Sequence, residues 1–516
     1  MRKRINMFVV LAMILVVGLL CGTTVQAKTI KKITVDMKAD PSPRKAIQAV
    51  FDEIGEDKGN DVLYEVTIPA GTYKIDGVLR VFSNTYVKMN GVTFVRCEAK
   101  SMLHLGEDTD KFYGYNGYHD ITFEGGTWDG NGKSNSKYDV SLIRLGHGKN
   151  IAFKNVTFKN ARDSHHVEMA ACQNVSFEKC TFNGYYGKKT SNNEALQVDV
   201  MHNATHFPMY AYFDDTPSSD IFVKNCTFTN LQRGVGTHSA VAGSYHENMV
   251  IEGNTFKNID GYAIICTNYR NAKIANNVIT DAGAGILFRN MVQGHNNFYT
   301  PLSGKAKINN NSNSEISGNK ITVTDKKYKT TAYGISLYGE KLSKKYKDAP
   351  KGDYTLKQVT VTNNTITMKN SGYGIWLQGT MDSTVYKNKV TMDIKSSVSG
   401  KGNADCIRLV KSKNNTIDTN TLTQKKKNKK TEKACGIVVT TSSSAVIKNN
   451  KINNSPKDGI FVVSKSQATI TNNVIKKTGR YGLNVCEKSK VTAKKNKMSK
   501  CGKRKTNTYA GGKIKK

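Results

Sequence analysis

A short repeat constrains the fold of this chain more than any other feature. In its clearest copies a branched or aromatic residue is followed three positions later by Asn and, after two more, by an apolar residue, as in Val250–Phe256, Val361–Ile366 and Ile470–Ile475. The spacing between copies never falls below 23 residues and is often larger. A fixed minimum with additions is typical of a solenoid whose turns carry inserted loops. The first residues of the pattern are Phe123, Phe153, Phe177, Val223, Ile251, Ile274, Ile316, Val361, Val385, Ile417, Ile447, Ile470 and Ala493.

A second pattern, Gly-apolar-x-apolar, lies between the copies, for example at Gly374–Leu377 and Gly459–Val462. Alternation with a period of two indicates strands, and no helical period interrupts them. Several short strands in each turn of 23 or more residues predict an all-β chain wound as one parallel β-helix. Adjacent turns of such a helix stack at roughly 4.8 Å.

The Asn of the repeat is expected to form a structural ladder at one bend of the helix. Stacked amides can hydrogen-bond each other and the backbone groups that a bend frees, and Asn tolerates a left-handed backbone. Cys180 and Cys226 fill the same position on two earlier turns and are interpreted as small packed residues. The ladder residues are Asn254, Asn277, Asn319, Asn364, Asn388, Asn420, Asn450, Asn473 and Asn496.

The two ends of the chain have their own signals. Residues 1–27 combine an Arg- and Lys-rich start, a short apolar run and a small-residue cleavage site, which predict a signal peptide and an exported protein without a transmembrane segment. Ser42 and Pro43 precede an apolar stripe and predict a capping helix at about residues 43–54. We expect the β-helix domain to cover residues 28–500, and residues 501–516 to be a disordered basic tail.

Charge divides the chain into two unlike halves. Residues 1–260 hold 29 basic and 28 acidic side chains, whereas residues 261–516 hold 48 and 13. Nine of the ten histidines also precede residue 261, so catalytic chemistry is expected in the first half. For an exported monomer, the lysine excess favours an anionic cell-wall polymer as partner over nucleic acid, with a merely solvated lysine surface as the alternative.

Two early segments carry a family resemblance. Val66–Tyr73 reads VTIPAGTY, and Asp120–Gly130 reads DITFEGGTWDG. In this order, after a capping helix, they resemble the pectate-lyase-like superfamily of right-handed parallel β-helices, and most nearly the polygalacturonase family of glycoside hydrolases. The resemblance implies a right-handed helix and cleavage of an acidic, pectin-like polysaccharide. Of that family's catalytic carboxylates, only the position of Glu194 has a counterpart here.

Outward-facing residues of neighbouring strands define a candidate site. With Leu196 and Val198 pointing inward, Asp199 is stacked beside His238 and lies diagonally from Glu168. One turn combined with a two-residue offset gives roughly 8 Å between the two carboxylate positions, the spacing of inverting glycosidases. The predicted catalytic residues are Asp199, Glu168, Glu194 and His238. The predicted substrate-binding residues are His166, Arg233, Arg289, Tyr212, Asp214 and Asp215.

The leading interpretation is a secreted or cell-wall-associated glycoside hydrolase that needs no cofactor and acts on a uronate-containing polysaccharide. The long insertion between Phe177 and Val223 supplies aromatic and acidic side chains near the candidate site. One alternative is a lyase that acts by β-elimination, with Asp214 and Asp215 holding calcium and Arg233 or His238 as base. Another is a non-catalytic surface adhesin whose basic half grips an anionic wall polymer.

Overall fold

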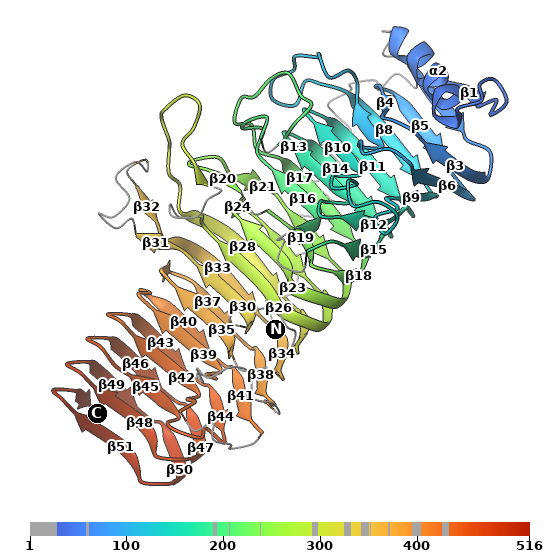
Figure 1. The fold of residues 1–516 in the computed structure, drawn as a ribbon. Coiled ribbons are helices and arrows are strands. Elements are labelled where there is room, and N and C mark those ends of the chain that lie inside the picture. Colours follow the sequence, from blue (N-terminus) through green and yellow to red (C-terminus); the bar gives the residue numbers. More distant parts are fainter. Residues whose placement is uncertain are drawn as a thin grey trace, which may run out of the picture.

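The computed structural model describes residues 28–57, 61–188, 193–205, 207–237, 239–291, 298–324, 332–341, 350, 352–369, 372–394, 404–425 and 433–516. Over these residues the chain is all-β and winds as a right-handed parallel β-helix with a helix at its N-terminal end (Figure 1). The predicted fold class is thereby confirmed. The predicted signal peptide, His238 and most of the lysine run at 425–430 lie outside the described residues.

Each turn of the helix passes through three faces. A strand of the first face is followed by the Asn bend, then by a strand of the second face, and then by a strand of the third face before the chain returns to the first. The long strands β23 and β26 run through both the second and third faces and join them into one sheet. The pairing between turns is parallel throughout these faces, as a solenoid requires.

The first face comprises β1 (Thr29–Thr34), β2 (Val62–Thr67), β5 (Thr85–Lys88), β8 (His119–Glu124), β11 (Lys149–Lys154), β14 (Gln173–Glu178), β17 (Ser219–Lys224), β22 (Val250–Glu252), β25 (Lys273–Ala275), β28 (Asn311–Ser317), β33 (Leu356–Thr362), β36 (Thr380–Met381), β37 (Thr384–Tyr386), β40 (Asn415–Asp418), β43 (Ser444–Lys448), β46 (Gln467–Thr471), β49 (Lys490–Lys494) and β52 (Lys513–Lys515).

The second face comprises β3 (Gly71–Ile75), β6 (Val92–Arg96), β9 (Thr127–Asp129), β12 (Thr157–Arg162), β15 (Thr181–Tyr186), β18 (Thr227–Leu231), the first parts of β23 (Thr255–Thr267) and β26 (Val278–Arg289), β29 (Lys320–Val323), β34 (Thr365–Met368), β38 (Lys389–Met392), β41 (Thr421–Gln424), β44 (Lys451–Asn453), β47 (Val474–Thr478) and β50 (Lys497–Cys501).

The third face comprises β4 (Leu79–Val81), β7 (Leu103–Leu105), β10 (Ile143–Gly146), β13 (Val167–Ala170), β16 (Glu194–Asp199), β19 (Arg233–Gly236), the second parts of β23 and β26, β30 (Ala332–Tyr338), β35 (Gly372–Gln378), β39 (Ile407–Val410), β42 (Ile437–Thr440), β45 (Ile460–Val462), β48 (Tyr481–Cys486) and β51 (Arg504–Tyr509). Short pairs β20 (Ala240–Val241) with β27 (Phe298–Tyr299), β21 (His246–Glu247) with β24 (Tyr269–Arg270), and β31 (Glu340–Lys341) with β32 (Asp353–Tyr354) tie loops together.

The core is built from identical positions stacked on successive turns. The first residues of the repeat align in one inward column, in which the rings of Phe123, Phe153 and Phe177 stack at 5.4 and 5.0 Å. From Val223 onward, β-branched residues continue this column and remain buried, and at Ala493 it ends half-buried. A buried phenylalanine contributes roughly 1.5–3 kcal/mol, so the stack accounts for much of the stability of the early turns.

The asparagine ladder is confirmed at the bend between the first and second faces. The backbone N–H and the side-chain amide of Asn319 both donate to Oδ1 of Asn364, each at 2.9 Å, and Asn364 repeats this toward Asn388 at 3.0 Å. The two cysteines extend the column, because the backbone N–H of Cys226 donates to Oδ1 of Asn254 at 2.8 Å. The ladder therefore satisfies buried backbone groups that no sheet could pair.

We expect Asn364→Leu to lower the free energy of unfolding by about 1–3 kcal/mol, because it leaves the N–H of Asn319 and the carbonyl of Ile316 buried without a partner. Chemical denaturation measures the change. Thr360→Leu, an exposed change on the same turn, is the control and should stay within about 0.5 kcal/mol. Equal stability of both variants would contradict the structural role of the ladder.

The N-terminal end of the core is covered as the sequence predicts. The helix α2 (Pro43–Glu56) begins after Ser42, whose hydroxyl accepts a hydrogen bond from the backbone N–H of Lys45, and buries Ile47, Phe51 and Ile54 against β3 and β4. Figure 1 shows α2 at one tip of the rod. Within the described part of the chain, no helix has the length and apolar character needed to cross a membrane.

The C-terminal end corrects a prediction. Residues 501–516 were expected to be a disordered basic tail, but β51 pairs with β48 and β52 pairs with β49, so the helix continues to Lys515. The inward positions of β51 hold Thr506 and Thr508 opposite Leu483 and Val485. Because these inward residues are polar, the alternation that marks earlier strands is hidden in the sequence.

Candidate functional site

Five of the ten predicted site residues lie on neighbouring strands of the third face: Glu168 on β13, Glu194 and Asp199 on β16, Arg233 on β19 and Arg289 on β26. The register pairs Glu168 with Gln197 and Ala170 with Asp199, so Glu168 lies diagonally from Asp199 as the sequence predicts. Loops inserted into the early and central turns project beside this part of the rod (Figure 1). His238, the expected neighbour of Asp199, lies outside the described residues.

Glu168 is held in a buried ion pair. Its Oε2 accepts hydrogen bonds from Nε of Arg144 at 2.9 Å and from the hydroxyl of Ser141 at 2.7 Å, and the residue is only 4% exposed. Burial alone would raise the pKa of Glu168, but Arg144, His165 and these hydrogen bonds outweigh it and keep the pKa below its usual value. Glu168 is therefore an ionised carboxylate whose charge is compensated by Arg144, which does not suit a general acid that must carry a proton.

Asp199 is also buried and hydrogen-bonded. It accepts from Nε2 of Gln197 at 2.6 Å, from the backbone N–H of Val200 at 3.3 Å, and from the hydroxyl of Ser239. The residue is 2% exposed. Gln197 thus hydrogen-bonds Asp199 and lies directly opposite Glu168 on the adjacent turn.

Glu194 lies at the edge of the same face, three residues before Gln197. Its Oε1 accepts from Nη1 of Arg233 on the next turn at 2.8 Å, and the Glu194 side chain has no exposed surface. Arg289, two turns beyond β19, donates from Nε to the hydroxyl of Thr267 at 3.0 Å. Burial and the like charge of Arg233 lower the pKa of Arg289 to about 10. Arg233 and Arg289 are therefore close enough to influence each other electrostatically, and their roles in substrate binding remain predictions.

His166 does not face a substrate from outside. Its ring lies edge-on to Phe182, Nε2 is 3.0 Å from the carbonyl of Gly184, and the residue is 1% exposed. Burial lowers the pKa of His166 to about 3, so the ring stays neutral. His166 was predicted to bind substrate because it lies near the long insertion, but it falls in the bend before β13, where its ring points into the packed interior.

The insertion between β16 and β17 covers this part of the third face. Met201 and Phe207 pack on Ala170 and Ala171, and Tyr210 lies against the backbone of Gly146, where any Cβ would come within 2.3 Å of the ring. The Tyr210 hydroxyl donates to the carbonyl of Arg144 at 3.2 Å. The insertion therefore covers Ala170 and Gly146 of the third face, and burial of Tyr210 raises its pKa well above the usual value.

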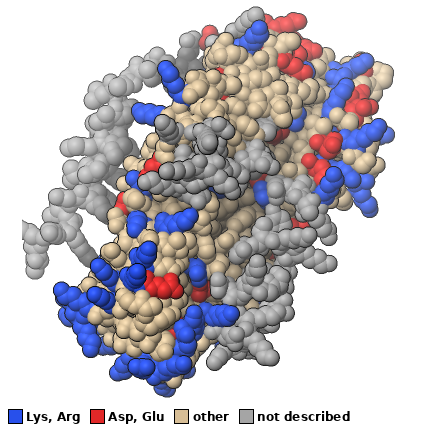
Figure 2. Space-filling view, turned by 60° about the vertical axis from the view of Figure 1, so that its left-hand side comes forward, with Lys and Arg blue, Asp and Glu red and all other residues tan. Residues whose placement is uncertain are grey.

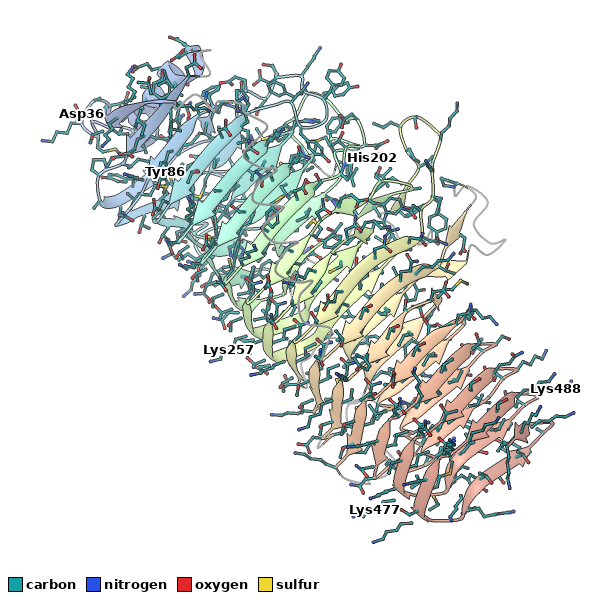
Figure 3. All side chains as sticks on the ribbon, turned by 180° about the vertical axis from the view of Figure 1, so that it is seen from behind. Asp36, Tyr86, His202, Lys257, Lys477 and Lys488 are labelled. Carbon is teal, nitrogen blue, oxygen red and sulfur yellow. The ribbon has the colours of Figure 1, made fainter. Side chains whose placement is uncertain are left out.

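The acidic residues of the insertion anchor it to other loops. Asp214 accepts from the backbone N–H of Gly114 at 2.7 Å, whereas Asp215 accepts from Nδ1 of His202 and the backbone N–H of Leu302, both at 2.5 Å. Figure 3 shows His202 among these loops. The two aspartates thus bind separate partners in this structure, and calcium binding by them stays a prediction. In the described residues no group of three His, Cys, Asp or Glu side chains is placed to hold a metal.

Tyr212, the remaining predicted binding residue, lies beside Tyr113 with ring centroids 3.9 Å apart and ring planes tilted by 49°. It is half-buried and belongs to the same loop cluster. Residues that the sequence reasoning missed are Arg144, Ser141, Gln197 and Ser239. Arg144 could have been found by extending the Glu168 column one turn toward the N-terminus, whereas Ser239 follows a strand and carries no pattern.

Known proteins share this architecture. The family model described as a right handed beta helix region matches residues 121–279, 217–391 and 349–515. A curated protein of Streptococcus pneumoniae, plasmin and fibronectin-binding protein A, is 24% identical over 319 residues, which cover 55% of this chain and 44% of that protein. The chain thus spans less than half the length of the curated relative that it matches.

Solved structures give two further likenesses. The crystal structure of PfbA, a surface adhesin of S. pneumoniae, aligns with 92% of this chain and 93% of its own at 17% identity and a TM-score of 0.45. The tailspike protein of E. coli bacteriophage HK620, bound to a pentasaccharide, aligns with 90% of this chain and 78% of its own at 12% identity and a TM-score of 0.49.

Proposed function

The chain belongs to the right-handed β-helix family, and on this scaffold we propose that it is a non-catalytic extracellular adhesin that binds an anionic cell-wall polymer. The binding surface that we propose is the basic first face of the last turns. Export rests on the signal peptide predicted at residues 1–27. A binding role also fits the name of the curated relative, which describes a protein that binds plasmin and fibronectin.

The observation that carries this proposal is the unbalanced charge of residues 433–516. They contain 20 basic side chains against 2 acidic ones, Asp458 and Glu487. Asp458 is fully buried in an ion pair with Arg480, and Glu487 accepts from the hydroxyl of Ser464. Figure 2 shows Lys and Arg gathered over the C-terminal end, whereas both signs are mixed at the other end. Such a field concentrates polyanions at the surface.

A shallow hollow lies on this basic face. It has a volume of about 590 Å³ and runs across β43, β46, β49 and β52. Lys490 and Lys513 stand at the same position of adjacent turns, and Lys515 borders them. The remaining lining residues are neutral, among them Gln467 and Thr492. A polymer with anionic groups along its length could therefore meet a lysine on successive turns.

The candidate catalytic carboxylates support binding over hydrolysis. A general acid or base must reach the proton that it transfers, within hydrogen-bond distance or through one water. Glu168 and Glu194 are instead paired with arginines, Asp199 is hydrogen-bonded, and all three are at most 4% exposed. In this arrangement the carboxylates stabilise the third face.

The direct test uses the mature chain and a panel of acidic and neutral polysaccharides. We expect retention on immobilised anionic polymer that weakens as salt rises, because exposed charges are screened, and no release of reducing ends or unsaturated uronates. Reducing ends alone would indicate a hydrolase, and both signals a lyase; either would overturn the non-catalytic proposal. Retention that is equal on neutral polymer would overturn the anionic partner.

Hydrolysis of an acidic polysaccharide is the second candidate, favoured by the diagonal placement of Glu168 and Asp199 on adjacent turns. If the wild type cleaves any member of the panel, Asp199→Asn should reduce turnover by a factor of about 10² or more, because it removes the acid or base. Steady-state assays measure this, with Asp220→Asn on the first face as control. Full activity of Asp199→Asn would move the catalytic site elsewhere.

A further inference from the structure

Three aromatic rings gather on the outer side of the third face, several turns beyond the carboxylates. Tyr333 of β30 and Tyr373 of β35 stack with centroids 5.8 Å apart and planes inclined by 19°. Trp376, also on β35, lies 4.5 Å from Tyr373 and 5.7 Å from Tyr333. Tyr333 and Trp376 remain partly exposed. The three rings occupy outward positions in or beside the Gly-apolar-x-apolar segments. The packing of the core does not require an aromatic residue at these positions.

A cation lies over these rings. The Arg408 guanidinium is 5.8 Å from the centroid of Tyr373 and 6.0 Å from that of Trp376. Nη1 of Arg408 donates to Asp405 at 2.7 Å, and the Asp405 side chain is only 2% exposed, which fixes the guanidinium in place. Arginine has five N–H donors, and the Arg408 side chain is 22% exposed, so donors beyond the one that bonds Asp405 can serve a ligand.

The same combination of ring and cation recurs farther along the face. Lys457 lies 4.7 Å from the ring of Phe461, and Arg480 lies 5.3 Å from the ring of Tyr481. The register of β35, β39, β42, β45 and β48 places Phe461 in the column of Trp376, and Tyr481 in the column of Tyr373. Five steps of about 4.8 Å separate the turn of Tyr333 from that of Tyr481, or about 24 Å. We call this set from Tyr333 to Tyr481 the aromatic strip.

We propose that the aromatic strip binds an acidic oligosaccharide whose sugars carry carboxylates. The apolar C–H face of a sugar ring packs on an aromatic ring, and a guanidinium beside that ring is suited to pair with a carboxylate in two parallel hydrogen bonds. A polymer of phosphates alone would use the cations and gain nothing from the rings. This site is separate from the lysine hollow, which lies on the first face.

The chain carries its own reporter for this site. It has only two tryptophans, Trp128 and Trp376. Trp128 is fully buried in the core beside Phe94, so its emission should not respond to a surface ligand. A ligand-induced change in tryptophan fluorescence therefore reports on Trp376.

The experiment titrates the full chain with two carboxylated probes, a hyaluronan oligosaccharide and a sialylated trisaccharide, and with their neutral methyl esters. We work at about 1 M salt, where the Debye length is about 3 Å and exposed lysines contribute little. We expect at least one acid to change the fluorescence, and its ester to bind at least tenfold more weakly. Which acid binds distinguishes uronate from sialate recognition.

Variants assign the signal to the strip. Trp128→Phe should keep the response and Trp376→Phe should lose it, while calorimetry shows whether affinity falls as well. Arg408→Gln should weaken binding of the acid at least tenfold and leave the ester unaffected, whereas Lys257→Gln, an exposed control on the second face (Figure 3), should change neither. No response to either acid, equal binding of acid and ester, or an unchanged affinity in Arg408→Gln would overturn the proposal.

Discussion

Replacing Arg144 by methionine should lower the free energy of unfolding by about 3–5 kcal/mol. The change removes the arginine from a pair in which the Arg144 and Glu168 side chains are 9% and 5% exposed, and it leaves the Glu168 carboxylate buried without its ion-pair partner. Ser141 can satisfy one lone pair but supplies no charge. Chemical denaturation at pH 7 measures the loss.

The loss should depend on pH in a defined direction. In the wild type the pKa of Glu168 is below its usual value, so the ionised Glu168 stabilises the folded state. This contribution to the free energy of unfolding is complete above the unfolded pKa of about 4.3 and is lost as pH falls through the folded pKa. In Arg144→Met, burial is no longer outweighed and the folded pKa rises. The difference between wild type and variant should therefore be largest near pH 7. It should shrink as pH falls, first because Glu168 becomes protonated in the folded variant, and then, below the unfolded pKa of about 4.3, because it also becomes protonated in the folded wild type.

Two further variants separate this effect from general damage. Arg144→Met combined with Glu168→Leu removes both charges and should recover most of the lost stability. Arg44→Met breaks a surface pair with Asp76, whose side chain is 43% exposed, and should cost about 1 kcal/mol at most. If Arg144→Met were no more harmful than Arg44→Met, the buried pair would not stabilise the fold.

The architecture could be predicted because one solenoid constraint repeats in every turn. The side-chain amide of the ladder must hydrogen-bond the next amide and a carbonyl of an adjacent turn, so the same residue type occurs at positions 364 and 388. The inward column must likewise remain apolar, as at Val361 and Val385. These requirements are local in sequence and identical between turns. The last turn was predicted to be a disordered tail because Thr506 and Thr508 occupy its inward positions, where Leu483 and Val485 stand on the turn before.

The site was harder to predict because its partners come from different turns and from inserted loops. The stacking of Glu168 beside Gln197 follows from the register, but the pairing of Glu168 with Arg144 depends on rotamers that no repeat specifies. The insertion could be recognised by its length, whereas its role as a cover depends on Tyr210 fitting over Gly146, 64 residues earlier in the chain. A strand pattern identifies which residues face outward and not what covers them.

Charge removal on the first face is the decisive experiment for the adhesin. Changing Lys490, Lys494, Lys513 and Lys515 to glutamine should weaken binding to an anionic polymer about a thousandfold at low salt and flatten its salt dependence, since each basic side chain near an anionic surface contributes roughly 1 kcal/mol. Retention on an anionic matrix across a salt series measures both. The matched control changes Lys476, Lys477, Lys497 and Lys500, which are also exposed but lie on β47 and β50 of the second face. Figure 3 shows Lys477 at a different edge of the rod from Lys488. Because both variants lose the same net charge, a similar loss in both would mean that overall charge, and not the hollow on the first face, determines binding.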